Sequence, residues 1–258
     1  MRLLRTAALA ALLAVGLTAC TGDDPEPDTS PGPAGGADRV VASTTWVGAL
    51  ARAAGATNVT VIAPANIPDQ AQFQPTEAEL APAADAEHVL YAESDAFAAQ
   101  LKSAAGEAHL VPVRPDNALP AIREEVSKLA EVFGTQATAS RWLIAFETQA
   151  TALSKGLQGV APIPAFTAVA QAEVAQWAEF AGVKVVGTYG PAAVTPAQLT
   201  GLAAKKPKLL LANVHVPART PNVPGAIRVD LVNYPGEDLN LYAVFVTNAD
   251  RISGTFAK

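Results

Sequence analysis

The stretch that decides the fold is residues 122–155, which read IREEVSKLAEVFGTQATASRWLIAFETQATALSK. Apolar residues recur at spacings of three and four on both sides of Gly134, and this is the period of an amphipathic helix. Gly134 predicts the end of the first helix, and Thr135 is expected to cap the second. The second helix, Gln136 to Lys155, has no internal breaker and is expected to be one long rigid rod.

On either side of this helical stretch, short β-branched runs alternate with alanine-rich runs of helical period. This alternation is typical of βα units, so an α/β fold with mainly parallel sheets is expected. Four strands precede the helices and four follow, which predicts two Rossmann-like lobes joined by the long helix. The predicted strands are Val40–Ser43, Val59–Ala63, His88–Tyr91, Leu110–Val113, Ala165–Val169, Val183–Gly187, Leu209–Asn213 and Ala226–Val229. The predicted boundaries are 39–117 for the N-terminal lobe, 118–157 for the helical connection and 158–258 for the C-terminal lobe.

The first 19 residues have the pattern of a signal peptide. Arg2 and Arg5 precede an uncharged stretch whose apolar part, Ala7 to Leu17, is shorter than the ~20 residues of a membrane-spanning helix. The stretch ends in Leu17-Thr18-Ala19-Cys20, which resembles the lipobox of bacterial lipoproteins. This resemblance implies cleavage before Cys20, acylation of Cys20 and attachment to the outer face of the cytoplasmic membrane.

Residues 20–38 are expected to form a disordered tether, because residues 21–38 contain no large apolar side chain. Loss of residues 1–19 leaves 16 of the 18 basic residues against 24 acidic ones, a formal charge of −8, which argues against a nucleic-acid partner. Cys20 is the only cysteine in the sequence, so no disulfide can form within one chain. We expect a monomer.

In open parallel sheets, ligands bind beyond the carboxyl ends of the strands. His88 and His109 begin their strands and are interpreted as structural, whereas His215 follows its strand toward the expected cleft. Several polar and aromatic residues lie at or beyond the predicted strand ends, and we select seven as ligand-binding candidates. They are Trp46, Gln72, Glu93, Gln171, Asn213, His215 and Asp230.

Several segments, in their order and spacing, resemble the metal-binding solute-binding proteins of ABC importers, the ZnuA and TroA-like group. The likeness extends from Arg39 to about Ile252. The segments that carry it are Val40-Val41-Ala42-Ser43-Thr44-Thr45-Trp46, Phe73-Gln74-Pro75-Thr76, Ala83-Ala84-Asp85-Ala86 and Ala181-Gly182-Val183-Lys184-Val185-Val186-Gly187.

The resemblance implies two α/β lobes joined by a long helix, with a metal held between them by three histidines and a carboxylate. In this sequence Ala71 stands at the first histidine position and Gln171 at the third, and residues 113–122 contain no histidine for the second. Asp230 matches the carboxylate, and His215 is the nearest remaining metal-ligand candidate. The metal site is therefore expected to be degenerate, because methyl and amide groups bind zinc poorly.

The expected function is that of a substrate-binding lipoprotein of an ABC importer of the metal-uptake family, with permease subunits as partners. The cargo is a divalent metal ion, a metal chelate or a small polar solute. The alternative is an accessory lipoprotein that kept the fold and lost metal binding. An enzyme is not expected, because the sequence has no dinucleotide fingerprint, phosphate loop or Gly-x-Ser-x-Gly elbow.

Overall fold

The structure is a computed structural model that describes residues 39–160 and 162–255. The predicted signal peptide, the Cys20 anchor and the tether lie outside these residues. Within the described part, no helix combines the length and the apolar character that crossing a bilayer requires.

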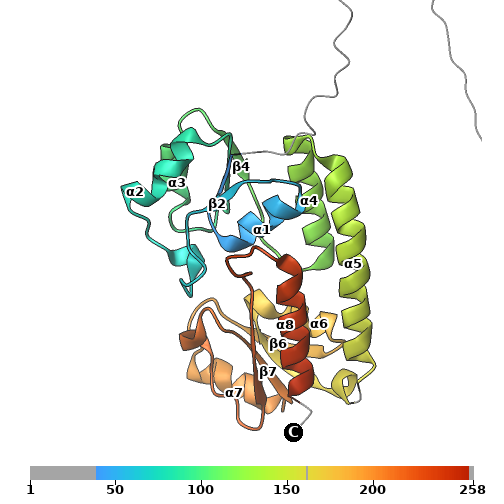
Figure 1. The fold of residues 1–258 in the computed structure, drawn as a ribbon. Coiled ribbons are helices and arrows are strands. Elements are labelled where there is room, and N and C mark those ends of the chain that lie inside the picture. Colours follow the sequence, from blue (N-terminus) through green and yellow to red (C-terminus); the bar gives the residue numbers. More distant parts are fainter. Residues whose placement is uncertain (1–38, 161, 256–258) are drawn as a thin grey trace, which may run out of the picture. The chain divides into compact units, whose positions relative to one another are not determined.

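Eight strands in the described residues form two four-stranded sheets, and every strand pairing is parallel. The order is β2-β1-β3-β4 in the N-terminal lobe and β6-β5-β7-β8 in the C-terminal lobe, so both sheets have the same topology. The two-lobe parallel α/β prediction is confirmed (Figure 1). The strands are β1 (Val40–Ala42), β2 (Val59–Val61), β3 (His88–Tyr91), β4 (His109–Pro112), β5 (Thr167–Gln171), β6 (Lys184–Tyr189), β7 (Leu209–Asn213) and β8 (Ile227–Leu231).

Three strands of the second sheet differ from their predicted ranges, and β6 does so by beginning at Lys184 and ending at Tyr189. β5 begins two residues late because Ile163–Ala165 form a 3-10 turn before it, closed by a hydrogen bond from Phe166 N to Ile163 O at 3.1 Å. β8 extends to Leu231 because Asp230 and Leu231 continue the pairing with β7. Asp230 therefore lies inside its strand and not beyond it.

Helices connect the strands and cover the sheets. The α-helices are α1 (Thr45–Ala53), α2 (Glu77–Leu80), α3 (Ala98–Ala104), α4 (Leu119–Phe133), α5 (Gln136–Gln158), α6 (Gln176–Phe180), α7 (Pro196–Ala204) and α8 (Leu241–Gly254). Short 3-10 turns are η1 (Gln70–Gln72), η2 (Ala81–Asp85), η3 (Ile163–Ala165), η4 (Ala172–Val174) and η5 (Pro217–Arg219).

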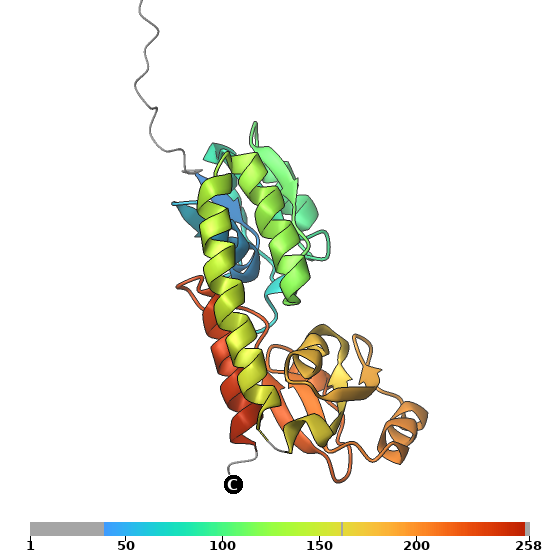
Figure 2. The same cartoon turned by 90° about the vertical axis from the view of Figure 1, so that its right-hand side faces the viewer.

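The long connecting helix is α5, as predicted, and it runs without a break from the N-terminal to the C-terminal lobe (Figure 2). Gly134 ends α4 in the left-handed conformation, at φ 68°. Thr135 occupies the N-cap position of α5, but its side chain makes no cap bond and donates instead to the Ala54 carbonyl. The predicted capping role of Thr135 is wrong, because this buried hydroxyl ties the start of α5 to the end of α1.

The sequence did not lead us to predict α8, which packs along α5 and reaches α1 (Figures 1 and 2). Asn240 begins α8, its side-chain oxygen accepting from Ala243 N at 3.2 Å. Leu239, just before it, packs on α1 at Gly48, where an added Cβ would lie 3.3 Å from a Leu239 methyl carbon. The C-terminal segment thus joins the connecting helix in holding the two lobes.

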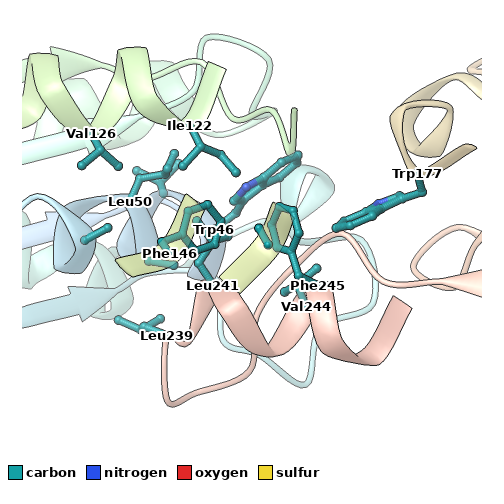
Figure 3. Close-up of a cluster of buried hydrophobic side chains, with 14 of the residues drawn as sticks. Trp46, Leu50, Ile122, Val126, Phe146, Trp177, Leu239, Leu241, Val244 and Phe245 are labelled. Atoms are coloured by element: carbon teal, nitrogen blue, oxygen red, sulfur yellow. The ribbon is translucent and has the colours of Figure 1, made fainter. Parts of the chain in front are cut away.

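One apolar core continues through both lobes along α5 and α8 (Figure 3). Phe245 on α8 is fully buried. Its ring centroid lies 5.1 Å from that of Phe146 on α5 and 4.8 Å from that of Trp177 on α6. Because close-packed interiors resist deformation, this shared core limits movement of one lobe against the other.

Candidate functional site

A cavity of about 570 Å³ lies between the two lobes at the carboxyl ends of the strands. Segments following all eight strands contribute to its wall, as the rule for open parallel sheets requires. Its lining residues are Thr44, Trp46, Asp69, Ala71, Gln72, Ser94, Asp95, Pro115, Asp116, Ala172, Glu173, Gln176, Pro191, Asn213, Val216, Arg219, Asn233 and Tyr234.

The most enclosed charged residue of the wall is Asp95, which is 6% exposed. Burial raises the pKa of its carboxyl group, while hydrogen bonding by the Ala92 N–H acts in the opposite direction. The Ala92 N–H donates to Oδ2 at 3.2 Å, which fixes the carboxyl group at the end of β3. Asp95 therefore presents a held, largely desolvated acid to the cavity.

A second acid, Asp69, comes from the loop after β2 and faces Arg219 of the C-terminal lobe, with Oδ2 and Nη2 4.0 Å apart. Burial raises the pKa of Asp69, Arg219 lowers it and the charge of Glu173 raises it. This long ion pair spans the cavity wall from one lobe to the other. Both side chains are more than a quarter exposed, so the pair contributes little to stability.

Two aromatic residues line the cavity from opposite lobes. The Trp46 and Tyr234 rings meet edge to face, with centroids 5.7 Å apart. Burial raises the pKa of the Tyr234 hydroxyl, and the charges of Asp69, Asp95 and Glu173 raise it further. Carboxylates from both lobes therefore act electrostatically on Tyr234.

His215 supports this aromatic pair from behind and does not line the cavity. Its ring packs on Tyr234 at 4.5 Å, and its Nε2 accepts from Tyr234 N at 3.4 Å. Burial lowers its pKa to about 4, against the raising effect of a hydrogen bond to the Pro68 backbone. At neutral pH His215 is therefore an uncharged support for Tyr234.

Two buried asparagines join the lobes beside the cavity. Asn117 Nδ2 donates to the Asn233 carbonyl at 3.2 Å, and Asn233 Nδ2 donates to the Glu173 carbonyl at 2.9 Å. Asn117 and Asn233 are each 2% exposed. These bonds link the start of α4 to the segments after β8 and β5, so they fix the spacing of the two walls.

Three of the predicted ligand-binding residues, Trp46, Gln72 and Asn213, lie on the cavity wall. Gln171 lies fully buried behind it, and its Oε1 accepts from Asn213 N at 3.0 Å. Glu93 lies outside, in an ion pair with Lys102 at 3.2 Å.

Asp230 also lies outside the cavity wall. It shares a separate surface depression with Arg228 and Arg251, and Arg228 Nε donates to its Oδ1 at 2.7 Å. The reason is strand alternation: Val229 and Leu231 point into the core, so Asp230 between them points to the opposite face of β8. The structure thus does not bring Asp230 and His215 together on the cavity wall.

The side chains of the cavity do not fit a metal ion held by three histidines and a carboxylate, the ligand set that the resemblance implies. Among the described residues, no group of three histidine, cysteine, aspartate or glutamate side chains converges closely enough to hold a metal ion. At two positions where the resemblance implies histidine, Ala71 presents a methyl group to the cavity, and Gln171 accepts a hydrogen bond from Asn213 N at the carboxyl edge of the sheet.

Some cavity residues were missed by the sequence reasoning. Asp116 follows β4, so the strand-end rule could have found it; its Oδ1 accepts from Ala118 N at 2.8 Å. Gln176 begins α6, and Arg219 lies in a proline-rich stretch with no strand beside it, so no periodic signal marked them.

Solved structures share this architecture. The SBP FpvC of Pseudomonas aeruginosa in complex with Ni²⁺ is 15% identical over 85% of this chain and 97% of its own, with a TM-score of 0.63. An Mn-bound periplasmic metal binding protein of Candidatus Liberibacter asiaticus is 12% identical over 85% of this chain and 100% of its own, with a TM-score of 0.61. The chain has the TroA-like solute-binding protein fold.

The TroA-like fold is also that of the laminin-binding protein Lbp of Streptococcus pyogenes, which is 16% identical over 84% of this chain and 99% of its own, with a TM-score of 0.59. A scan of protein-family models and a search of curated proteins find no match to the sequence. At these identities the likeness is one of fold, so the chemistry of the cavity has to be argued from its own residues.

Proposed function

We propose that the protein is an extracytoplasmic substrate-binding lipoprotein that captures a small polar solute between its lobes and delivers it to the permease of an ABC importer. One observation carries the proposal. A cavity of about 570 Å³ is built from the carboxyl-end segments of all eight strands in a TroA-like fold. This volume is within the range of small-molecule sites.

The cargo we propose is a solute with hydrogen-bonding groups and not a bare transition metal. Three histidines and a carboxylate would be needed for the family's metal, and this chain offers Ala71 and a buried Gln171 at two of those positions. In their place the wall carries hydroxyl and carboxylate groups together with the side-chain amides of Gln72, Gln176 and Asn213. Such groups fix the orientation of a polar molecule and give specificity.

We propose a binding role and not catalysis. Solved proteins that share this fold include an SBP, a metal binding protein and a laminin-binding protein. The cavity wall in the described residues carries carboxylates but no histidine, lysine or cysteine.

The binding test uses the full chain solubilised in mild detergent and follows its thermal unfolding against panels of amines, amino acids, sugars, metal chelates and free metals. A solute present at 100 times its Kd should add about 2.7 kcal/mol to the free energy of unfolding. We expect one class of organic solute to do so, and the effect to be lost in Asn213→Ala. If no solute stabilises the protein, the alternative of an accessory lipoprotein without cargo takes its place.

The anchor is tested separately by mass spectrometry of the mature N-terminus. We expect the chain to begin at Cys20 and to carry acyl groups there, and a Cys20→Ser variant to carry none. A mature chain without acylation at Cys20 would contradict the lipoprotein assignment and leave the cavity argument unchanged.

A further inference from the structure

The cavity wall is strongly acidic. It carries the carboxylates of Asp69, Asp95, Asp116 and Glu173, and Arg219 is the one basic residue among the described residues that line it. Asp116 uses one carboxylate oxygen to hold Ala118 N, and Asp69 faces Arg219. In the described part of the chain, no basic side chain forms an ion pair with Asp95 or Glu173 within 4.0 Å.

Burial makes these two carboxylates unusual. Asp95 is 6% exposed, and Glu173 has an enclosed Oε2 that accepts no hydrogen bond from the described residues. Burying a charged oxygen without a partner, as at Glu173 Oε2, costs several kcal/mol, whereas Asp95 keeps a partner in the Ala92 N–H. A positively charged group in the cavity would supply the missing partner.

The aromatic residues strengthen this argument from a different direction. Tyr234 lies close enough to Asp69, Asp95 and Glu173 for their charges to raise the pKa of its hydroxyl. Trp46 lines the cavity from the other lobe, and its ring meets the Tyr234 ring edge to face with centroids 5.7 Å apart. Aromatic rings together with carboxylates attract organic cations, because the ring face carries partial negative charge and the ring also covers alkyl groups.

This arrangement of carboxylates and aromatic rings does not suit a bare metal ion. The carboxylates do not converge in a group of three in the described residues, and the cavity of about 570 Å³ is far larger than a bare ion needs. An organic cation can span the distance between carboxylates that are spread over both lobes.

We propose, resting on the solute-binding function above, that the cargo is a small organic cation with an ammonium group, held by the Tyr234 ring and the carboxylates of Asp95 and Glu173. The cation supplies the charge that these carboxylates lack within the protein. His215 stays neutral behind Tyr234 and adds no competing positive charge at neutral pH.

The test is isothermal titration calorimetry of the full chain in detergent with choline, tetramethylammonium and putrescine. The matched neutral probe for choline is dimethylbutanol, in which a tert-butyl group replaces the trimethylammonium group. We expect at least one ammonium probe to bind, choline about tenfold or more tightly than dimethylbutanol. Glu173→Gln and Tyr234→Leu should each weaken binding about tenfold.

The controls are Asp230→Asn and Glu93→Gln, which make the same kind of charge change outside the cavity and should leave binding unchanged. Urea unfolding of every variant separates lost binding from lost folding. Equal affinity for choline and dimethylbutanol would overturn the inference. So would failure of all three ammonium probes while a neutral or anionic solute binds, an outcome that leaves the proposed function standing. If no solute of any class binds, both fail.

Discussion

Gln171 Oε1 accepts a hydrogen bond from Asn213 N at 3.0 Å, and this bond ties the carboxyl end of β5 to that of β7. Both residues are buried, Gln171 completely. At the position where the resemblance implies a metal-ligating histidine, the chain therefore carries a structural amide. The bond closes the back of the cavity and positions Asn213 on its wall.

Replacing Gln171 tests this structural role. Gln171→Ala leaves the buried Asn213 N–H without an acceptor and should lower the free energy of unfolding by about 1–3 kcal/mol. Urea denaturation measures the change. Gln72→Ala, an exposed change on the same cavity wall, should stay within about 0.5 kcal/mol. Equal effects of the two substitutions would contradict the role of Gln171.

Zinc should stabilise the protein little. A site with a Kd of about 1 µM would add about 2.7 kcal/mol at about 100 µM zinc. We expect a much smaller change in the unfolding free energy, because Asp230 is paired with Arg228 outside the cavity wall. A large stabilisation that EDTA reverses and that Asp230→Ala abolishes would show that the metal site works.

The stability of the fold should fall in mildly acidic solution because of His215. Burial lowers its pKa from 6.5 to about 4, so between these values the unfolded chain binds a proton that the folded chain does not. The free energy of unfolding therefore decreases as the pH falls from about 6.5 to about 4. His215→Asn should flatten this part of a pH series of urea unfolding curves.

Other titratable groups also change the free energy of unfolding over this pH range, some in the same direction as His215 and some in the opposite direction. The pKa of His88 is also lowered by burial, so it acts in the same direction as His215. Asp69 and Asp95 have raised pKa values, so their contribution to stability increases as the pH falls. For this reason the difference between wild type and His215→Asn is the measurement. A pH-independent difference would show that His215 is not buried as described.

The shared core should depend on Phe245. Its ring joins α8 to the connecting helix α5 and to α6, so Phe245→Ala removes contacts to both of these helices and should cost about 3–5 kcal/mol. Ile144→Ala on the exposed side of α5, where Ile144 is 69% exposed, should cost less than about 0.5 kcal/mol. Two separate unfolding transitions in Phe245→Ala would indicate that the lobes are joined mainly by this core.

Periodicity predicted most of the fold because buried parallel strands and amphipathic helices leave strong local signals. His88–Tyr91 and Leu209–Asn213 match their predicted ranges, and α5 begins at Gln136 as expected. Helix α8 (Leu241–Gly254) was not predicted. Its packing on α1 and α5 depends on contacts distant in the sequence, which no local pattern encodes.

The site was predicted less well, because the strand-end rule locates an edge of a sheet but not the direction of a side chain. Trp46, Gln72 and Asn213 lie on the cavity wall, whereas Glu93 follows its strand, Asp230 lies inside its strand, and both face away from the cavity. Asp230 became part of the strand by one added pairing with β7, which set its face. Arg219 reaches the cavity only through tertiary packing of the proline-rich stretch.

The most direct test of the central claim identifies the molecule that the cavity holds when the protein is purified. Full-length protein, purified in detergent at neutral pH, is denatured, and the released small molecules and metals are measured by mass spectrometry against a Glu173→Gln and Tyr234→Leu double variant. We predict an organic molecule with an ammonium group, released near one per chain from wild type and strongly reduced in the variant. Release of about one zinc or manganese per chain, with no organic molecule, would contradict the account.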